Sequence, residues 1–191
     1  MTSPDYWDAE AATFDDEPDH GLRQPQARAA WRDLLRDVLP QPPARIADLG
    51  CGTGTLSLLL AEDGHHVDGV DFAPAMVRQA VAKVGQRAHF VVGDAAAPPL
   101  APGSYDVVLC RHVLWAMPDP SAALRRWRHL LAGGGRLVLV EGFWHTGAGL
   151  TAARCTELLE PVGQVEVRPL TDPVLWGGPV EDERYVLVCR T

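Results

Sequence analysis

Acidic residues and alternating glycines make up the stretch with the most specific chemistry in this chain. In Asp48-Leu-Gly-Cys-Gly-Thr-Gly54, glycines stand at alternate positions between a short apolar strand and the apolar start of a helix. Such glycines let the backbone take positive φ and let a ligand lie directly on the main chain, while the following helix offers free N–H groups. Asp71 follows Gly50 by 21 residues, at the end of the next predicted strand, where an acidic residue binds a ribose diol. The pattern predicts a nucleotide-like cofactor site at the carboxyl end of the first strand.

The glycine spacing distinguishes between cofactors. A dinucleotide fingerprint is G-x-G-x-x-G and opens a helix whose N-terminus holds a pyrophosphate. Here the run is G-x-G-x-G, and Thr55 stands where the third dinucleotide glycine would be. A carboxylate at Asp48 would repel a pyrophosphate but suits a ligand with a sulfonium or ammonium group. A ligand with a ribose, a positive charge and no pyrophosphate is S-adenosylmethionine, and the presence of both Asp48 and Asp71 disfavours a purely structural glycine turn.

These residues resemble motif I of the class I S-adenosylmethionine-dependent methyltransferases. The similarity extends through four further segments, Val70–Met76, Val92–Ala95, Tyr105–Val108 and Leu130–Leu137. It covers roughly residues 43–141 and is specific for the superfamily, but it does not identify the substrate. Other positions resemble a small bacterial subgroup of the family, namely Trp7, Asp19–Gly21, Arg111–His112 and Glu141–Trp144.

The resemblance implies an α/β fold with a Rossmann-like, doubly wound sheet of seven strands in the order 3-2-1-4-5-7-6, with strand 7 antiparallel. A length of 191 residues fits one domain. We therefore expect residues 1–191 to form a single methyltransferase domain, with residues 1–40 as an N-terminal helical lid or cap. A short helix is expected over Asp5–Phe14, and the acidic loop Asp15–Gly21 after it is either a lid over the cofactor or a solvated cap.

Apolar periodicity and turn residues predict the remaining elements. Helices are expected over Pro25–Leu39, from Leu56 to the stop at Gly64, over Pro74–Val84, from Asp119 or Pro120 to about Leu131, and over about Gly149–Glu160. Strands are expected at Ile46–Leu49, His66–Val70, Ala88–Val92, Tyr105–Cys110, Arg136–Val140, Gln164–Arg168 and Arg184–Cys189, with a turn at Gly133–Gly135 before the fifth. The last two strands are expected to be antiparallel at the sheet edge.

The resemblance also implies roles in cofactor binding. Asp48 and the glycines are expected around the methionine part and the ribose, Asp71 at the ribose hydroxyls, and Asp94 at the adenine amino group. Met76 is alternatively a core residue, and Asp94 is alternatively a strand-end cap. The expected cofactor-binding residues are Asp48, Gly50, Cys51, Gly52, Gly54, Asp71, Phe72, Met76, Gly93, Asp94, Ala95 and Arg111.

Two histidines are candidate catalytic bases, because an unperturbed imidazole titrates near neutral pH. His112 follows the fourth strand, at the crevice where substrate and cofactor meet in an open α/β sheet, and is alternatively a structural hydrogen-bonding residue. His20 lies in the expected lid, with Gly21 beside it as a hinge. Four aromatic residues are expected to wall the substrate pocket, although Trp115 alternatively packs on the helix after it: Trp7, Trp115, Phe143 and Trp144.

Charge and composition limit the partners of the chain. A formal net charge of −8 disfavours a nucleic-acid partner, which usually needs a basic face. No apolar run is long enough to span a membrane, and residues 1–10 lack an apolar signal segment, so we expect a cytoplasmic monomer or homodimer without membrane contact. No metal site is expected, because His65-His66 reads as a solvated strand start without a third ligand. Free thiols are expected at Cys51, Cys110, Cys155 and Cys189.

Taken together, the residues predict an S-adenosylmethionine-dependent methyltransferase that acts on a small-molecule acceptor by in-line transfer, with S-adenosylhomocysteine as the second product. One alternative is a protein or RNA methyltransferase with a partner that supplies recognition. The other is a cofactor-binding regulatory or structural protein that transfers no methyl group. An intact glycine motif and a polar segment after the fourth strand favour catalysis. The sequence does not identify the acceptor atom.

Overall fold

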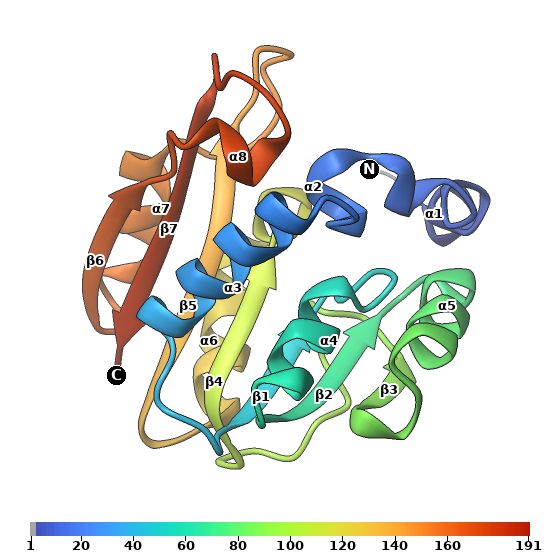
Figure 1. The fold of residues 1–191 in the computed structure, drawn as a ribbon. Helices are drawn as coiled ribbons and strands as arrows, with labels where there is room; N and C mark the ends of the chain where they lie inside the picture. Colours follow the sequence, from blue (N-terminus) through green and yellow to red (C-terminus); the bar gives the residue numbers. More distant parts are fainter. Residues whose placement is uncertain (1–2) are drawn as a thin grey trace.

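Seven strands form one sheet in the order β3-β2-β1-β4-β5-β7-β6 in the computed structural model, which describes residues 3–191 (Figure 1). Strands β1 to β5 run parallel, whereas β7 runs antiparallel to both of its neighbours, β5 and β6. The predicted strand order and the antiparallel seventh strand are confirmed. The strands are β1 (Arg45–Leu49), β2 (His66–Asp71), β3 (His89–Val92), β4 (Tyr105–Arg111), β5 (Leu131–Phe143), β6 (Gln164–Pro169) and β7 (Glu183–Arg190).

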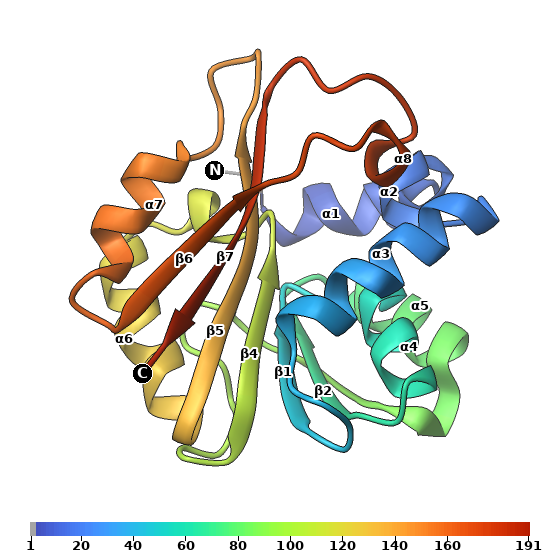
Figure 2. The ribbon, with the colours of Figure 1, turned by 60° about the vertical axis from the view of Figure 1, so that its left-hand side comes forward.

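Helices cover both faces of this sheet (Figure 2). On one face lie α6 (Pro120–Leu130) and α7 (Ala152–Leu159), and on the other lie α3 (Pro25–Val38), α4 (Thr55–Glu62) and α5 (Pro74–Val84). Proline occupies the first turn of α3, α5 and α6, where its fixed φ suits a helix start and its missing N–H costs nothing. The helix starts were therefore predictable from local sequence.

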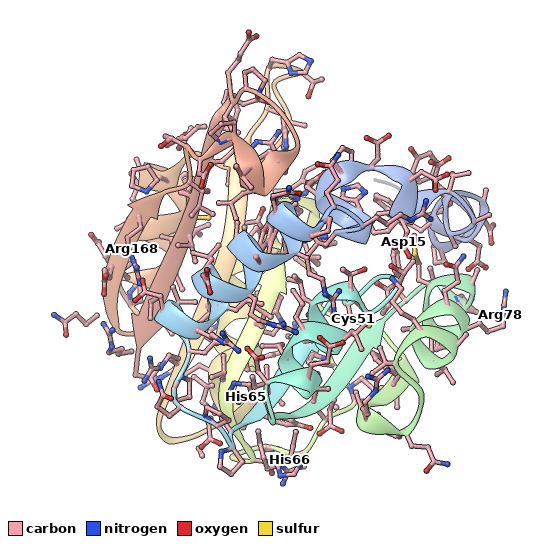
Figure 3. All side chains as sticks on the ribbon, in the orientation of Figure 1. Asp15, Cys51, His65, His66, Arg78 and Arg168 are labelled. Atoms are coloured by element: carbon pink, nitrogen blue, oxygen red, sulfur yellow. The ribbon has the colours of Figure 1, made fainter. Side chains whose placement is uncertain are left out.

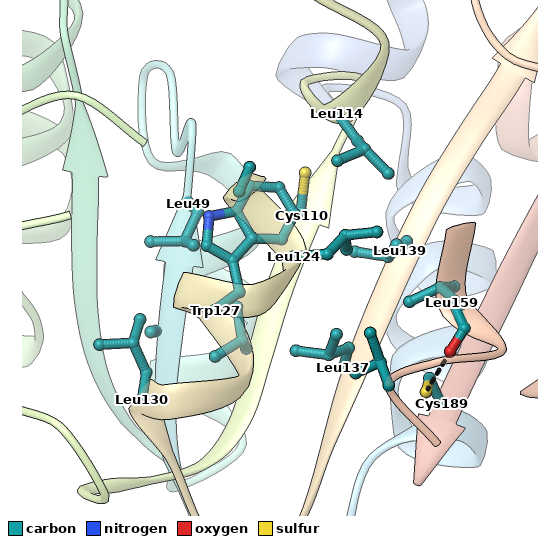
Figure 4. Packing of buried hydrophobic residues seen from close by; sticks show 14 of the residues in the cluster. Leu49, Cys110, Leu114, Leu124, Trp127, Leu130, Leu137, Leu139, Leu159 and Cys189 are labelled. Atoms are coloured by element: carbon teal, nitrogen blue, oxygen red, sulfur yellow. Dashed lines mark hydrogen bonds between the residues drawn. The ribbon is translucent and has the colours of Figure 1, made fainter. Parts of the chain in front are cut away.

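The core consists of two apolar layers, one on each face of the sheet. Trp127 of α6 is fully buried in the first layer, and its Nε1 donates to the Ala95 carbonyl at 2.7 Å (Figure 4). Because both faces are covered, the central strands are almost continuously apolar. Alternate strand residues divide between the layers: Ala47, Leu49, Val108, Cys110, Leu137 and Leu139 lie with α6 and α7, and Ile46, Val107, Leu109, Val138 and Val140 lie with α3 and α4.

The strand order reverses between β1 and β4, and this reversal determines where a ligand fits. From β1 the chain moves outward to β2 and β3, and it then returns to β4 on the other side of β1. Connections diverge at such a point and leave a crevice outside the carboxyl ends of the two strands. The turn Gly50–Gly54 follows β1 here, and residues 112–117 follow β4.

The N-terminal segment crosses the carboxyl ends of the strands as three short helices, α1 (Pro4–Glu10), η1 (Phe14–Asp16) and α2 (Pro18–Gly21) (Figures 1 and 2). The predicted helix over residues 5–14 is therefore too long, and the predicted loop over residues 15–21 is largely helical. Pro18 in the first turn of α2 was the missed signal. The helix α3 also falls within residues 1–40, but it covers a sheet face and buries Trp31 and Leu35 there.

Two further elements differ from the sequence prediction. The short helix α8 (Pro173–Trp176) was not predicted, although Asp172 accepts from Val174 N at 2.9 Å and Gly177 ends the helix with a φ of 75°. This cap, proline and glycine pattern is a readable helix signal. In addition, β5 begins at Leu131 and includes the predicted turn at 133–135, where its register against β4 shifts.

His65 is buried, with 7% of its surface exposed, so the expected solvated strand start holds only for His66. The tight chain reversal after α4 accounts for this, because His65 N bonds to Leu60 O at 3.0 Å. Figure 3 shows both histidines at the opposite end of the sheet from Asp15 and Cys51. Over residues 3–191, no helix has the length and apolar character needed to cross a membrane.

Candidate functional site

A cavity of about 680 Å³ lies at the carboxyl ends of the strands, under the N-terminal segment. Its wall combines residues 7–20 with the turn after β1 and with the ends of β2, β3, β4, β5 and β7. Segments far apart in sequence therefore meet at one site. Most of the predicted site residues line it: Trp7, His20, Asp48, Gly50, Cys51, Gly52, Asp71, Phe72, Met76, Asp94, Ala95, Arg111, His112, Trp115 and Trp144.

The turn after β1 requires glycine at Gly50 and favours it at Gly52. Gly50 has a φ of 70°, and a Cβ at this position would lie 2.3 Å from Val113 Cγ2. Gly52 has a φ of 54°, and its Cβ position lies 3.4 Å from Phe14 Cε1 of the N-terminal segment. The turn therefore contacts the segment after β4 on one side and the N-terminal segment on the other, with its backbone exposed to the cavity between them.

Three predicted site residues lie outside the cavity wall. Gly54 faces α5, where its Cβ position lies 2.9 Å from Ala80 Cβ. Gly93 packs against a proline ring, with Pro99 Cδ 2.8 Å from its Cβ position. Phe143 is 40% exposed at the end of β5, so it does not form the predicted aromatic wall. The glycines instead permit close packing of the elements that carry the cavity.

Two buried carboxyl groups face the cavity from the ends of β1 and β2. Asp48 is 3% exposed and accepts a hydrogen bond from Ser57 Oγ at 2.6 Å, and burial raises its pKa to about 6. Asp71 accepts from Gly52 N and Ala73 N, both at 2.9 Å, and burial raises its pKa as well. Asp71 therefore links the ends of β1 and β2 and is held in one orientation.

Asp94 and Ala95, two of the predicted cofactor-binding residues, follow the end of β3. Asp94 is exposed, and its Oδ1 accepts from Ala96 N at 2.8 Å, so the capping interpretation holds alongside its place in the cavity wall. Met76 likewise fits both of its predicted roles: it lines the cavity, and it is buried like a core residue, with only 2% of its surface exposed. Cys51 lies in the wall too, and burial raises the pKa of its thiol well above the usual value.

Charged contacts attach the N-terminal segment to this wall. Asp15 accepts from Thr53 Oγ1 at 2.5 Å and pairs with Lys83 Nζ at 2.7 Å. Lys83 Nζ also donates to Thr53 Oγ1 at 2.8 Å and to Thr55 Oγ1 at 2.7 Å. At the start of α5, the backbone N–H of Ala75 donates to Asp8 Oδ1 at 2.6 Å. The glycine turn, α5 and the N-terminal segment therefore share one hydrogen-bond network.

Arg111 and His20 lie at the junction of the N-terminal segment with β4. Arg111 Nη1 donates to the Asp19 carbonyl at 2.6 Å, and its guanidinium carbon lies 5.0 Å from the Trp31 ring centroid. His20 stacks on Phe14 with ring centroids 4.2 Å apart, and its Nδ1 lies 3.2 Å from the Phe14 carbonyl. Because a carbonyl only accepts, Nδ1 carries the proton and Nε2 is left as the acceptor. Burial and the charge of Arg111 lower the pKa of His20.

His112 takes a left-handed backbone conformation, with a φ of 57°, directly after β4. Its ring stacks on Trp176 at 5.8 Å and meets Trp144 edge-on at 5.2 Å. Its Nε2 is buried without a hydrogen-bond partner within residues 3–191. Burial, together with the charges of Arg111 and Arg184, lowers its pKa well below the usual value. The hydrogen bonds that the structure shows for His112 are made by its backbone, where His112 N donates to Val140 O at 2.9 Å, and the lowered pKa favours the neutral imidazole.

The aromatic wall differs in part from the prediction. Trp115 and Trp144 line the cavity with ring centroids 5.4 Å apart, and Trp7 meets Phe14 edge-on at 6.0 Å on the opposite side. Trp115 Nε1 donates to the His112 carbonyl at 2.9 Å, which fixes the turn after β4. The wall therefore combines aromatic surface with a small number of fixed polar groups, as small-molecule sites generally do.

Sequence interpretation missed three functional candidates, Glu141, Arg184 and Lys83. Glu141 is fully buried at the end of β5, and its Oε1 accepts from Val113 N at 3.0 Å and Leu114 N at 2.8 Å, while Oε2 has no partner among the described residues. Burial raises its pKa to about 8. The signal for Glu141 was an acidic residue within a continuous apolar strand, whereas Arg184 and Lys83 become recognisable only through tertiary contacts.

The residues present fit a nucleoside with a cationic centre. Asp48 supplies a buried carboxyl group beside the glycine turn, and Asp71 supplies a second one beside the same turn, at the end of β2. The missing Cβ atoms of Gly50 and Gly52 leave main chain at the cavity surface. No group of three or more potential metal ligands comes together within residues 3–191.

Comparison with known proteins gives a consistent set of similarities. Residues 47–139 match a family described as methyltransferase domain. The demethylmenaquinone methyltransferase of Thermus thermophilus is 40% identical over 118 residues, which cover 58% of this chain and 53% of that protein. A ubiquinone biosynthesis O-methyltransferase of Xanthomonas campestris is 33% identical over 141 residues, which cover 70% of this chain and 54% of that protein. The chain thus spans about half the length of the curated relatives it matches.

A solved structure supports the same similarity across more of the chain. The magnesium protoporphyrin IX methyltransferase of Synechocystis, solved with bound S-adenosylmethionine, is 26% identical and superimposes with a TM-score of 0.67. The match covers 87% of this chain and 79% of that chain. The likeness therefore extends beyond the segment matched by the domain family.

The buried Glu141 predicts a pH-dependent stability. An unfolded glutamate titrates near pH ~4.3, so between about pH 5 and 8 the folded state keeps a proton that the unfolded state has lost. The free energy of unfolding should therefore fall as pH rises through this window. Glu141→Gln keeps the acceptor for both N–H groups and removes the titration, so its stability relative to wild type should increase from pH 5 to 8 in urea denaturation.

Two further variants make this test specific. Glu141→Ala leaves two buried N–H donors unsatisfied and should cost about 1–3 kcal/mol for each. Glu160→Gln, at an exposed position after α7, should follow the wild-type pH curve. Parallel pH curves for wild type and Glu141→Gln would contradict the assignment of a raised pKa to Glu141.

Proposed function

Because this chain belongs to the class I S-adenosylmethionine-dependent methyltransferases, we propose that it transfers the methyl group of S-adenosylmethionine to a small-molecule acceptor. The family uses this cofactor, as the sequence predicted. S-adenosylmethionine supplies an activated methyl group on a sulfonium. The protein therefore has to bind the cofactor, align the acceptor for in-line transfer and exclude water.

One observation carries this proposal: a single cavity at the reversal point of the sheet has both Asp48 and Asp71 in its wall, next to a glycine turn. The carboxyl of Asp71 suits two ribose hydroxyls, and that of Asp48 suits the cationic end of the ligand. Phe72, Met76, Asp94 and Ala95 would then surround the adenine on the β2 and β3 side. The volume of about 680 Å³ leaves room for a second small molecule.

The acceptor would occupy the opposite end of the cavity, between the ends of β4 and β7. His112, Trp115, Trp144 and Arg184 line that end. His20 and His112 are the candidate bases, because both line the cavity and both have lowered pKa values that keep the imidazole neutral. A neutral imidazole within reach of the acceptor can take its proton as the methyl group is transferred.

Two properties favour a small molecule over a macromolecule as acceptor. The two curated relatives described above have names that refer to menaquinone and ubiquinone chemistry, and so to small molecules. The cavity is roofed by the N-terminal segment, and the formal net charge is −8, which disfavours RNA. We further propose a cytoplasmic location, because the four cysteines are free and buried, as thiols in a reducing compartment are, and a monomer or homodimer as the assembly.

We also propose that residues 1–191 form one domain and that its N-terminal part acts as a lid. The covering part is residues 3–21, since α3 belongs to the sheet layer, and residues 1 and 2 lie outside the described part of the chain. Phe14 lies over Gly52, and Asp15 binds Thr53 and Lys83 beside it. These polar contacts can open and close without breaking the core.

The first test concerns the cofactor. Asp71→Asn removes one charged acceptor, so the Kd for S-adenosylhomocysteine should rise about tenfold or more, as expected for hydrogen bonds to a charged group. Isothermal titration calorimetry measures this directly. Asp33→Asn, on the exposed side of α3, is the matched control and should bind like wild type. Equal affinity of Asp71→Asn and wild type would overturn the proposed site.

The second test concerns the lid. Adding S-adenosylhomocysteine should slow amide hydrogen exchange over residues 5–21, because a ligand beneath the segment stabilises its closed form. Asp15→Asn should reduce this protection, since it weakens the contacts with Thr53 and Lys83. Exchange in α6, which is distant from the lid, is the internal control. Identical rates with and without ligand would exclude a lid role while leaving the proposed activity intact.

The third test concerns the base. If an imidazole takes the acceptor proton, replacing that histidine by Ala should lower kcat by ~10²–10⁴ with cofactor affinity nearly unchanged. Because burial lowers the pKa of both histidines, the acid limb of the wild-type rate profile should lie below the usual 6.5. Single-turnover rates of His20→Ala and His112→Ala across pH 5 to 8 measure this. Wild-type rates in both variants would mean that transfer needs no base.

A further inference from the structure

Arg184 lies in an unusual environment at the acceptor end of the cavity. Its guanidinium carbon is 4.9 Å from the Trp176 ring centroid and 5.4 Å from the Trp144 ring centroid. The stem is fixed as well, because Arg184 pairs with Gly142 across the β5–β7 ladder and a Cβ on Gly142 would lie 3.0 Å from Arg184 Cδ. The cation is therefore held in place, with 17% of its side chain exposed.

The hydrogen-bonding capacity of this guanidinium is largely unused. Among residues 3–191 its five N–H donors make one contact, an ion pair in which Nη2 lies a long 3.4 Å from Asp182 Oδ2, and Nε is buried without a partner. Asp182 also accepts from His145 N at 3.2 Å. The two indole faces attract the charge but accept no in-plane hydrogen bond. Arg184 is therefore a half-buried cation in the cavity wall, with one long ion pair and unused donors that a further anion could accept from.

His112 places a second polar group in the same aromatic environment. Its ring contacts Trp144 and Trp176, the two rings that also flank Arg184. Because the imidazole is neutral, it adds no charge that would compete with Arg184 for an anion. Trp115 and Trp144 meet edge-on, with an angle of 66° between their ring planes, and add aromatic surface to the cavity wall that an aromatic molecule can pack against.

We propose, on the basis of the proposed function, that the methyl acceptor is a planar aromatic molecule with a carboxylate or an equivalent anionic group, and that Arg184 binds this group. The planar fork of arginine matches a carboxylate through two parallel N–H···O bonds. The aromatic walls alone would also suit a cationic acceptor, but the guanidinium between them repels one. Arg184 is thus the specificity-determining residue at this end of the cavity.

The test uses three planar probes of matched size: 2-naphthoate, 2-naphthamide and 2-naphthylmethylammonium. Calorimetric titration of wild type with S-adenosylhomocysteine comes first, and each probe is then titrated into the saturated complex. The naphthoate should bind at least tenfold more tightly than the amide, and the ammonium compound should bind most weakly, since charge-assisted hydrogen bonds are the strong ones. Equal binding of the three probes, or no binding of the naphthoate, would overturn the acceptor assignment.

Two variants assign the effect to Arg184. Arg184→Met keeps an apolar stem between the tryptophans and should reduce naphthoate affinity to the level of the amide, whereas Arg184→Lys should retain part of the preference. Arg154→Met, on the exposed face of α7, is the matched control. If Arg184→Met fails to fold, the order of the three probes on wild type still decides. Failure of wild type to bind S-adenosylhomocysteine would overturn the proposed function and this inference together, whereas cofactor binding without anion preference overturns only the inference.

Discussion

The two hydrogen bonds that Glu141 accepts from Val113 N and Leu114 N hold in place the segment after β4, which brings His112 and Trp115 to the cavity wall. They connect the end of β5 to the segment after β4, at a point where the regular backbone pairing between the two strands has ended. Val113 in turn lies against Gly50, so the position of this segment also limits the turn after β1. His112, one residue earlier, keeps its left-handed backbone because its neighbours are fixed on both sides. Burying Oε2 without a hydrogen-bond partner among residues 3–191 costs free energy, and the two hydrogen bonds to Oε1 offset part of that cost.

The N-terminal segment is attached in a different way. Its contacts with the rest of the fold are mostly polar: Asp8 with Ala75 N, Asp15 with Thr53 and Lys83, and the Asp19 carbonyl with Arg111. Only a small apolar cluster, which includes Ala11, Ala73 and Met76, joins it to α5. The two sheet layers, by contrast, are large and apolar. This difference in the type of contact supports the proposal that the N-terminal segment opens as a lid while the sheet keeps its packing.

The sequence predicted the sheet and the residues that line the cavity at the ends of β1 and β2, because both depend on local patterns. The strand order followed from recognisable motifs, and Asp48, Gly50 and Asp71 are fixed by their places at strand ends.

The proposed acceptor side was less predictable, because Arg184 meets Trp144 and Trp176 only through the β5–β7 register and an unpredicted helix, α8. Phe143 was assigned to the wall instead of to the surface, because the sequence does not show which face of β5 turns toward the cavity. Lys83 reads as an ordinary charged helix residue until Asp15 and Thr53 are seen beside it.

Burial and two nearby guanidinium groups explain the state of both histidines. Arg111 and Arg184 stand in the cavity wall at the ends of β4 and β7, although an acidic residue lies beside each of them, Asp19 at Arg111 and Asp182 at Arg184. Asp19 lies 3.9 Å from His20 and raises its pKa, but burial and Arg111 act in the opposite direction and outweigh it. His112 has no carboxylate partner at all in the described chain, and Arg111 and Arg184 both disfavour its protonation. An imidazole in such a field is a weaker base than one paired with a carboxylate, but it is already deprotonated at neutral pH. The lowered pKa values favour neutral imidazoles, and under the proposed function this leaves either histidine able to take a proton from the acceptor.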